Sequence, residues 1–110
     1  MTIKWVVSDP LVMNGEPFCY GTRLTVRNIL ELRGAGYTLG RMLKDHPELR
    51  RMGIAAAYEY AARHRDRYAE FFEPDGSLTG PGYSESEAAG LPVQYRLPGV
   101  VIKSSDRGPA

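Results

Sequence analysis

The sequence predicts a mainly α-helical protein with a small N-terminal β element, a three-helix bundle and an extended C-terminal tail. Three observations predict this fold class. Short β-prone segments surround an Asn-Gly dipeptide near the N-terminus, and apolar residues recur at helical spacing between residues 25 and 72. Gly, Pro and Ser then accumulate after residue 73. We therefore expect a folded domain over residues 1–72 and a flexible or partner-ordered tail over residues 73–110.

The N-terminal β element is predicted from β-prone segments at residues 3–7, 11–13 and 16–20. Asn14-Gly15 separates the last two segments, and Asn-Gly is a strong hairpin signal because both turn residues accept positive φ. We expect a hairpin with two or three short strands. Such a ribbon is only marginally stable alone, so it must pack on the helices or pair with a second copy of the chain.

The first two predicted helices have start and stop signals. Thr25 is the expected N-cap of the first helix, and Gly34 and Gly36 end it. Thr38 is the expected N-cap of a short second helix, which ends at Pro47. The inward face of the first helix is expected to comprise Val26, Ile29, Leu30 and the stem of Arg33.

The third predicted helix is the longest and runs from about residue 50 to residue 72. An apolar stripe predicts it, because its members alternate at spacings of three and four residues. The helix ends before Pro74 and Gly76. The stripe consists of Ile54, Ala57, Ala61, His64, Tyr68 and Phe71.

The charge distribution and the cysteine content indicate which partners and which metal or disulfide sites the chain can have. The net charge is +1, but residues 1–72 carry eleven Lys and Arg against eight Asp and Glu, and residues 73–110 carry three against five. The mildly basic front part points to an anionic partner. Cys19 is the only cysteine, which excludes an internal disulfide and a thiolate metal cluster. We expect no cofactor and no bound metal.

Targeting signals are not apparent in the sequence. The start, MTIKWVVSDP, lacks the pattern of a signal peptide, and no apolar run has the length of a membrane span. We therefore expect a cytoplasmic protein without membrane contact.

Three helices with a tight connector between the second and third are typical of helix-turn-helix organisation. In that arrangement the third helix lies in the major groove of DNA and the second crosses the phosphate backbone. Arg41 and Lys44 lie on the expected exposed side of the second helix, and Arg50 and Arg51 open the third. These four residues are candidate contacts to phosphate or guanine. The alternative is a solvated basic face.

The stretch Gly21-Thr22-Arg23 joins the β element to the first helix. Gly21 is expected at positive φ, and Thr22 is expected to bond to nearby backbone. Arg23 is then held ahead of the first helix, where it is a further candidate phosphate contact. Its alternative role is to cap a helix C-terminus or to pair with a carboxylate such as Asp9.

A set of short motifs and single positions between residues 3 and 65 forms one pattern. It consists of Ile3, Asp9-Pro10, Gly15-Glu16-Pro17, Gly21-Thr22-Arg23, Val26, Gly36, residues 43–47, Leu49, Ile54, Ala57 and Tyr60-Ala61. In this pattern the chain resembles the domain of unknown function 433 family, and the G-x-P…G-T-R element is the most specific part of the match. The members are small bacterial and archaeal proteins with a homeodomain-like helix-turn-helix, so the resemblance implies DNA binding and dimerisation.

The chain departs from the family pattern at the start of the third helix. The family tends to have Thr followed by acidic residues there, whereas this chain has Arg50-Arg51-Met52-Gly53. The change from negative to positive charge fits contact with phosphate or bases. The chain also has Asp45-His46-Pro47 where the family tends to place an aromatic residue before the proline.

Some relatives in the family resemble VapB-type antitoxins, which are encoded beside PIN-like ribonuclease toxins. The resemblance therefore implies a toxin partner for the tail, where a basic side chain would neutralise an acidic metal site. The alternatives are an inert tail or a strand that completes the β element through residues 93–97 or 100–102. The candidate partner-binding residues are Tyr68, Phe71, Leu91, Val93, Tyr95, Arg96, Val100 and Ile102.

Catalysis is not expected. His46 and His64 are the only histidines, and neither forms a nucleophile motif with Cys19. The leading hypothesis is a dimeric DNA-binding antitoxin that represses its own operator and neutralises a PIN-like ribonuclease toxin. The alternative is a non-enzymatic protein-interaction adaptor that does not bind DNA.

Overall fold

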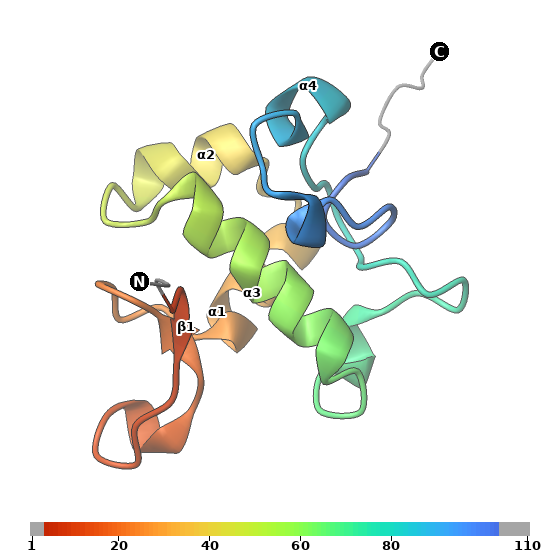
Figure 1. Cartoon of the computed structure of the whole chain (residues 1–110). Coiled ribbons are helices and arrows are strands. Elements are labelled where there is room, and N and C mark those ends of the chain that lie inside the picture. The colour runs from red at the N-terminus through yellow and green to blue at the C-terminus, as the bar shows by residue number, and fades with distance from the viewer. Residues whose placement is uncertain (1–3, 104–110) are drawn as a thin grey trace.

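The structure is a computed structural model, and it describes residues 4–103. This part of the chain holds a two-stranded sheet near the N-terminus, four α-helices and three 3-10 turns (Figure 1). The mainly α-helical fold class with a small N-terminal β element is thus confirmed. The elements are β1 (Val6–Val7), η1 (Met13–Gly15), β2 (Phe18–Cys19), α1 (Val26–Gly34), α2 (Leu39–Asp45), α3 (Arg51–Arg63), η2 (Ala69–Phe71), α4 (Glu85–Ala88) and η3 (Val93–Tyr95).

The sheet pairs β1 with β2 in antiparallel register, with Val6 opposite Cys19. The predicted two-residue hairpin turn at Asn14-Gly15 is wrong, because this dipeptide lies in η1, within the long connection between the strands. Positive φ does occur there, at 55° for Asn14 and 78° for Gly15. Burial sets the register instead, since Cys19 is buried and its thiol donates to the Gly53 carbonyl of α3 at 3.5 Å.

The predicted boundaries of α1 and α2 are confirmed by their caps. The Thr25 hydroxyl accepts the Asn28 N–H at 2.9 Å, and the Asn28 side chain accepts the Thr25 N–H at 3.1 Å. Thr38 accepts the Arg41 N–H at 3.2 Å in the same way. Each bond supplies a partner to an N–H that the helix itself leaves free. Gly36 has φ of 101° directly after α1, as expected of a C-terminal stop.

Helix α3 ends at Arg63, so the prediction that it continues to residue 72 is wrong. The backbone leaves helical geometry at His64, which has φ of −128° and ψ of 49°. The charged residues 65–67 form an exposed turn, and the chain then returns to the core at Tyr68, whose side chain is fully buried. The apolar residues keep helical spacing on both sides of this turn, because α3 and the segment that begins at Tyr68 face the same core.

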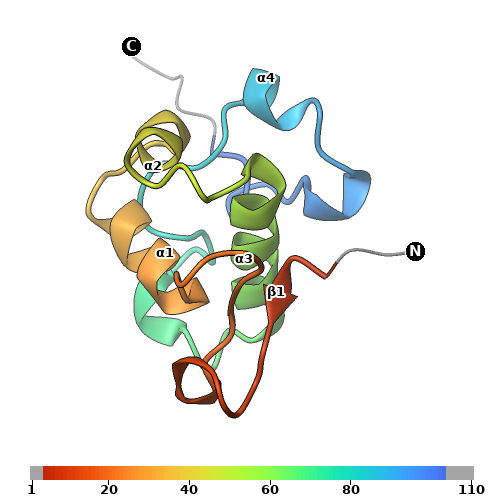
Figure 2. The same ribbon diagram turned by 90° about the vertical axis from the view of Figure 1, so that its left-hand side faces the viewer.

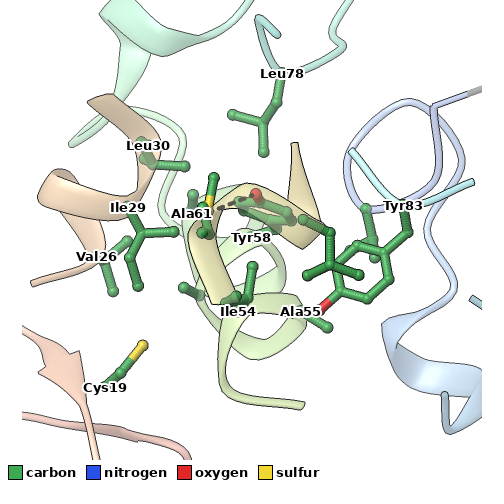
Figure 3. Close-up of a cluster of buried hydrophobic side chains, with 14 of the residues drawn as sticks. Cys19, Val26, Ile29, Leu30, Ile54, Ala55, Tyr58, Ala61, Leu78 and Tyr83 are labelled. Atoms are coloured by element: carbon green, nitrogen blue, oxygen red, sulfur yellow. Dashed lines mark hydrogen bonds between the residues drawn. The ribbon is translucent and has the colours of Figure 1, made fainter. Parts of the chain in front are cut away.

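Helix α3 lies at the centre of the molecule. Figure 1 shows β1 on one side of it and the chain after residue 73 on the other, and Figure 2 shows α1 beside it. Every residue from Gly53 to Tyr58 is buried, as is Ala61. Figure 3 shows side chains from α1, α3 and the later part of the chain converging on this core.

Residues 73–103, here called the C-terminal segment, are folded against the helices. The structure differs at this point from the expected flexible or partner-ordered tail, because Leu78 and Tyr83 are buried in the same core as α3. The alternative of a strand at residues 93–97 is also wrong, since residues 93–95 form η3. Residues 104–110 of the predicted tail lie outside the described part of the chain. No helix among residues 4–103 is long and apolar enough to cross a membrane.

Candidate nucleic-acid interface

The predicted DNA-contacting residues of α2 and α3 all have exposed side chains. Arg41 and Lys44 lie on α2, Arg50 occupies the N-cap position of α3 and Arg51 is its first residue. Residues 41–51 hold these four basic side chains against the two acidic side chains of Asp45 and Glu48, which gives a local net charge of +2. The surface formed by α2, the connection and the first residue of α3 therefore carries a net positive charge, and its basic side chains are open to solvent.

Arg41 is partly engaged within α2. Its Nε lies 3.4 Å from the Asp45 carboxylate, and its guanidinium lies 4.3 Å from the centre of the Tyr37 ring. An exposed ion pair of this kind contributes little to stability and is easily exchanged for another anion. Lys44, Arg50 and Arg51 form no ion pair with any residue in the range 4–103. Their charges are available to a partner.

The start of α3 has no side-chain cap and no acidic residue in its first turn. The first helical hydrogen bond runs from the Ile54 N–H to the Arg50 carbonyl at 3.0 Å. The N–H groups of residues 51–53 have no acceptor among the described residues. A helix start carries partial positive charge, which the two arginines increase. An anion placed there would satisfy these donors and offset the charge.

The Gly-Thr-Arg stretch has the expected backbone. Gly21 has φ of 81°, and the Thr22 hydroxyl donates to the Cys19 carbonyl at 2.9 Å and accepts the Leu24 N–H at 3.0 Å. Arg23 is exposed and has no ion pair with any residue from 4 to 103. It lines an open groove of about 860 Å³ together with Glu48 from the α2–α3 connection.

The C-terminal segment covers one flank of α3. Tyr83 of the C-terminal segment is fully buried, and its hydroxyl donates to the backbone carbonyl of Arg51. Its ring packs edge-on against Tyr58 of α3, with ring centres 6.2 Å apart. This flank of α3 is therefore closed to an external partner. Only the N-terminal end of α3 presents exposed basic side chains beside α2.

Arg33 was expected to place only its stem on the inward face of α1, but its guanidinium is buried as well and has a structural role. It is fully buried, and its guanidinium donates to the carbonyls of Gly80 at 3.3 Å, Leu78 at 3.5 Å and Val100. The guanidinium also lies 4.4 Å from the centre of the Tyr58 ring. Burial lowers the pKa of Arg33 and raises that of Tyr58 to about 12. Arg33 thus ties the C-terminal segment to α1 and α3, and its place on the apolar face of α1 was the only sequence signal.

The predicted partner-binding residues divide into buried and accessible ones. Tyr68 and Leu91 are buried within the chain's own core, so neither offers a surface to a partner in this conformation. Arg96 donates to the carbonyls of Leu91 at 2.7 Å and Ala89 at 3.2 Å. Arg96 is exposed, as is Val93, at 77%. The half-buried members are Phe71, Tyr95, Val100 and Ile102.

Cys19 and His64 were weighed as candidates for catalysis, and both have defined surroundings in the structure. Cys19 is buried, and burial raises the pKa of its thiol to about 12, so it remains protonated at neutral pH. His64 packs on the Tyr60 ring, with ring centres 4.2 Å apart. Across residues 4–103, no three His, Cys, Asp or Glu side chains come together as metal ligands.

Comparison with known sequences places the chain in a family. The sequence profile of a family described as protein of unknown function (DUF433) matches residues 6–61, just over half of the chain. The chain belongs to the DUF433 family. No curated protein and no solved structure matches it. The part of this DUF433 protein that matches runs from β1 to the last turns of α3, so it includes Arg33 but none of the carbonyls that Arg33 contacts.

Proposed function

We propose that this DUF433 protein binds double-stranded operator DNA through α2 and the start of α3, as the repressor and antitoxin of a type II toxin–antitoxin module. One observation carries the DNA-binding part. Arg50 and Arg51 are exposed at an uncapped helix start, beside the exposed basic side chains of α2. Positive charge at this end opposes the helix dipole and serves no local purpose, whereas a phosphate group would relieve it.

In the proposed complex, α2 and α3 act as a helix-turn-helix that approaches DNA with the tip of α3. Helix-turn-helix proteins contact base edges with the N-terminal residues of their recognition helix. Arg50 and Arg51 would donate to guanine or phosphate, and Lys44 and Arg41 would follow the backbone across α2. Arg23 would add a phosphate contact if the DNA extends over the groove that it shares with Glu48. The covered flank of α3 would remain outside the DNA groove.

The antitoxin part of the proposal rests on the family resemblance, because some relatives in the family resemble VapB-type antitoxins. The proposed partner is a PIN-like ribonuclease, and the proposed repressor is a homodimer. Val93, Tyr95 and Arg96 are the accessible candidates for toxin contact in the C-terminal segment. Arg96 would supply the positive charge that an acidic nuclease site attracts. Leu91 would contribute only by supporting this surface from the core.

Fluorescence-anisotropy titration of the purified protein with its own promoter fragment tests the DNA-binding proposal. Scrambled DNA of the same length and composition is the reference, and two salt concentrations are used. We expect tighter binding to the promoter and a steep loss of affinity with salt, because phosphate contacts release counterions. Equal weak binding to both DNAs would argue against an operator-binding repressor.

The double variant Arg50→Ala/Arg51→Ala tests the assigned surface. If each arginine contacts a phosphate, the slope of log Kd against log salt falls in magnitude by about two. The matched control is Arg65→Ala/Arg67→Ala, which removes the same charge from the exposed turn after α3. The control is expected to keep most of the promoter affinity. If the two variants lose affinity equally, net charge rather than the start of α3 governs binding.

A second candidate function is a protein-interaction adaptor that does not bind DNA. The burial of α3 along its flank favours it, because a helix covered by Tyr83 and its neighbours has little surface to present to a groove. The same titration separates the two functions, since the adaptor predicts no preference for the promoter. Co-purification with the product of an adjacent gene would then become the informative experiment.

A further inference from the structure

The outer edge of β1 has unpaired backbone groups in a defined position. The Tyr20 N–H donates to the Trp5 carbonyl at 2.8 Å, so Trp5 and Tyr20 form a hydrogen-bonded pair of the ladder. Hydrogen-bonded and non-hydrogen-bonded pairs alternate along antiparallel strands. The Val6–Cys19 pair is therefore non-hydrogen-bonded, and both backbone groups of Val6 point away from β2. The Cys19 N–H also points away from its partner strand, as expected of a non-hydrogen-bonded pair, and it donates to the Leu24 carbonyl at 2.9 Å.

The second edge of the sheet is thus closed, and only the β1 edge is open among the described residues. Phe18 forms a bridge with Thr25, which covers the outer side of β2. No hydrogen bond from residues 4–103 reaches the N–H or the carbonyl of Val6. An open strand edge is a template for pairing with a further strand.

A groove of about 390 Å³ lies along this open edge. Aromatic side chains line it from three parts of the chain, with Trp5 beside β1, Tyr60 on α3 and Tyr95 on η3. Glu59 and Arg63 also line it and form an ion pair with 2.6 Å between the Arg63 Nε and the carboxylate. The groove therefore offers an edge for backbone pairing, apolar surface for packing, and charges of both signs.

We propose that a second copy of this chain occupies the groove, with the two β1 strands pairing antiparallel about a two-fold axis at Val6. Each Val6 would donate its N–H to the carbonyl of Val6 of the partner subunit and accept in return. The product is a continuous four-stranded sheet in the order β2-β1-β1-β2. The proposal names the surface of the homodimer that the proposed function requires, but the pairing itself does not depend on DNA binding.

The sequence around Val6 is self-complementary in this register. Pairing Val6 with itself sets Trp5 opposite Val7 of the partner subunit, and aromatic residues opposite β-branched ones stabilise antiparallel sheets. Lys4 comes to lie opposite Ser8 of the partner subunit, so no like charges face each other. A two-stranded ribbon is only marginally stable, and doubling it to four strands brings it into the range of independent sheets. A second copy would therefore pair the free backbone groups of Val6 and would also place compatible side chains opposite each other.

The decisive experiment compares Ser8→Glu with Ser8→Lys in the full chain by sedimentation equilibrium. Lys4 and Ser8 are both exposed, so neither substitution disturbs the core. In the proposed dimer residue 8 lies opposite Lys4 of the partner subunit. Ser8→Glu therefore forms an attractive Glu–Lys pair across the strands, and Ser8→Lys forms a repulsive Lys–Lys pair. We expect the dimer of Ser8→Glu to be tighter than wild type and that of Ser8→Lys to be weaker, with the difference shrinking at high salt.

Val6→Pro is the second variant, because proline removes the outward N–H while the ladder to β2 does not use it. We expect its dimer dissociation constant to rise roughly tenfold or more, since two symmetric hydrogen bonds are lost. Val6→Ala retains the N–H and is the matched control, and circular dichroism reports whether each variant folds. If Val6→Pro does not fold, the Ser8 pair decides the question.

Three results would overturn the proposed pairing: a wild-type chain that stays monomeric at its highest soluble concentration, equal dimerisation of the two Ser8 variants, or a dimer that Val6→Pro leaves unchanged. The promoter titration tests a different surface. A dimer that responds to Ser8 but ignores the promoter would refute DNA binding and leave the β1 interface standing.

Discussion

Arg33 in α1 and Arg50 with Arg51 at the start of α3 show opposite uses of the same side chain. The Arg33 guanidinium is fully buried and donates to three carbonyls of the C-terminal segment, with no carboxylate beside it. The other two arginines are exposed and unpaired within residues 4–103. Carbonyl dipoles and an aromatic ring compensate a buried cation, whereas an exposed cation remains free for an external anion.

The buried position of Arg33 explains how the helices hold a C-terminal segment that has little regular secondary structure of its own. The segment contributes Leu78, Tyr83 and Val101 to the core, and Arg33 supplies hydrogen-bond donors to its irregular backbone. A buried carbonyl without a donor would be destabilising. Arg33 thus acts inside the fold, while the start of α3 is left for binding.

Arg33→Met tests this division and should have the largest effect. The substitution keeps an apolar stem but leaves the carbonyls of Leu78, Gly80 and Val100 without their donor. We expect the free energy of unfolding to fall by about 3 kcal/mol or more, measured by urea denaturation. Amide exchange should also quicken at Leu78 and Tyr83, whose N–H groups bond to Gly99 at 3.0 Å and Val101 at 2.8 Å.

Arg27→Met is the matched control for Arg33→Met, because it makes the same change on the same helix. Arg27 is partly exposed and pairs with Glu70 on the surface. The free energy of unfolding should fall clearly less for Arg27→Met than for Arg33→Met, since solvent replaces the partner of an exposed charge. Equal losses in the two variants would mean that Arg33 has no special role in holding the C-terminal segment.

Gly80→Ala should have the next largest effect. Gly80 has φ of +94°, and an added Cβ would overlap the backbone carbonyl of Arg33. We expect a loss of about 2 kcal/mol or more in the free energy of unfolding, since strain and a steric clash act together. Gly90→Ala is the control, because nothing lies within 4 Å of its added Cβ. A Gly80→Ala protein as stable as its control would show that the segment does not pack against Arg33 in solution.

Tyr83→Phe should have the smallest effect of the three. It removes only the hydroxyl that donates to the Arg51 carbonyl and keeps the ring against Tyr58. We expect a loss of about 1 kcal/mol by urea denaturation, as for other single hydrogen bonds. Tyr20→Phe is the control, since Tyr20 is 62% exposed. If Tyr83→Phe is as stable as its control, the link between the C-terminal segment and the start of α3 is unimportant.

Predictions from the sequence succeeded where neighbouring residues decide the structure. Thr25 and Thr38 cap helices because a hydroxyl can accept an N–H two or three positions ahead in any context. Gly21 and Gly36 adopt positive φ because the local turn requires it. The exposure of Arg41 and Lys44 on α2 also agreed with the prediction, because the apolar residues of this short helix fix its buried face.

Predictions failed where distant segments compete. The apolar stripe of α3 continued past Arg63, but helical spacing cannot distinguish a longer helix from a turn that returns Tyr68 to the same core. The C-terminal segment looked flexible because Gly and Pro are frequent in it. Two of these glycines, Gly80 and Gly82, instead permit its backbone to approach Arg33 closely.

The sequence by itself determined the first two helices, the positive φ of Gly21 and Gly36, and the positive charge at the start of α3, because caps, turn residues and charges act over a few positions. Only the tertiary structure decided that Arg33 is buried, that the C-terminal segment covers α3, and that Val6 faces an open groove. Each of these three features depends on contacts between residues far apart in the chain. The desolvation, hydrogen bonding and packing that decide them arise only when those segments come together in the fold.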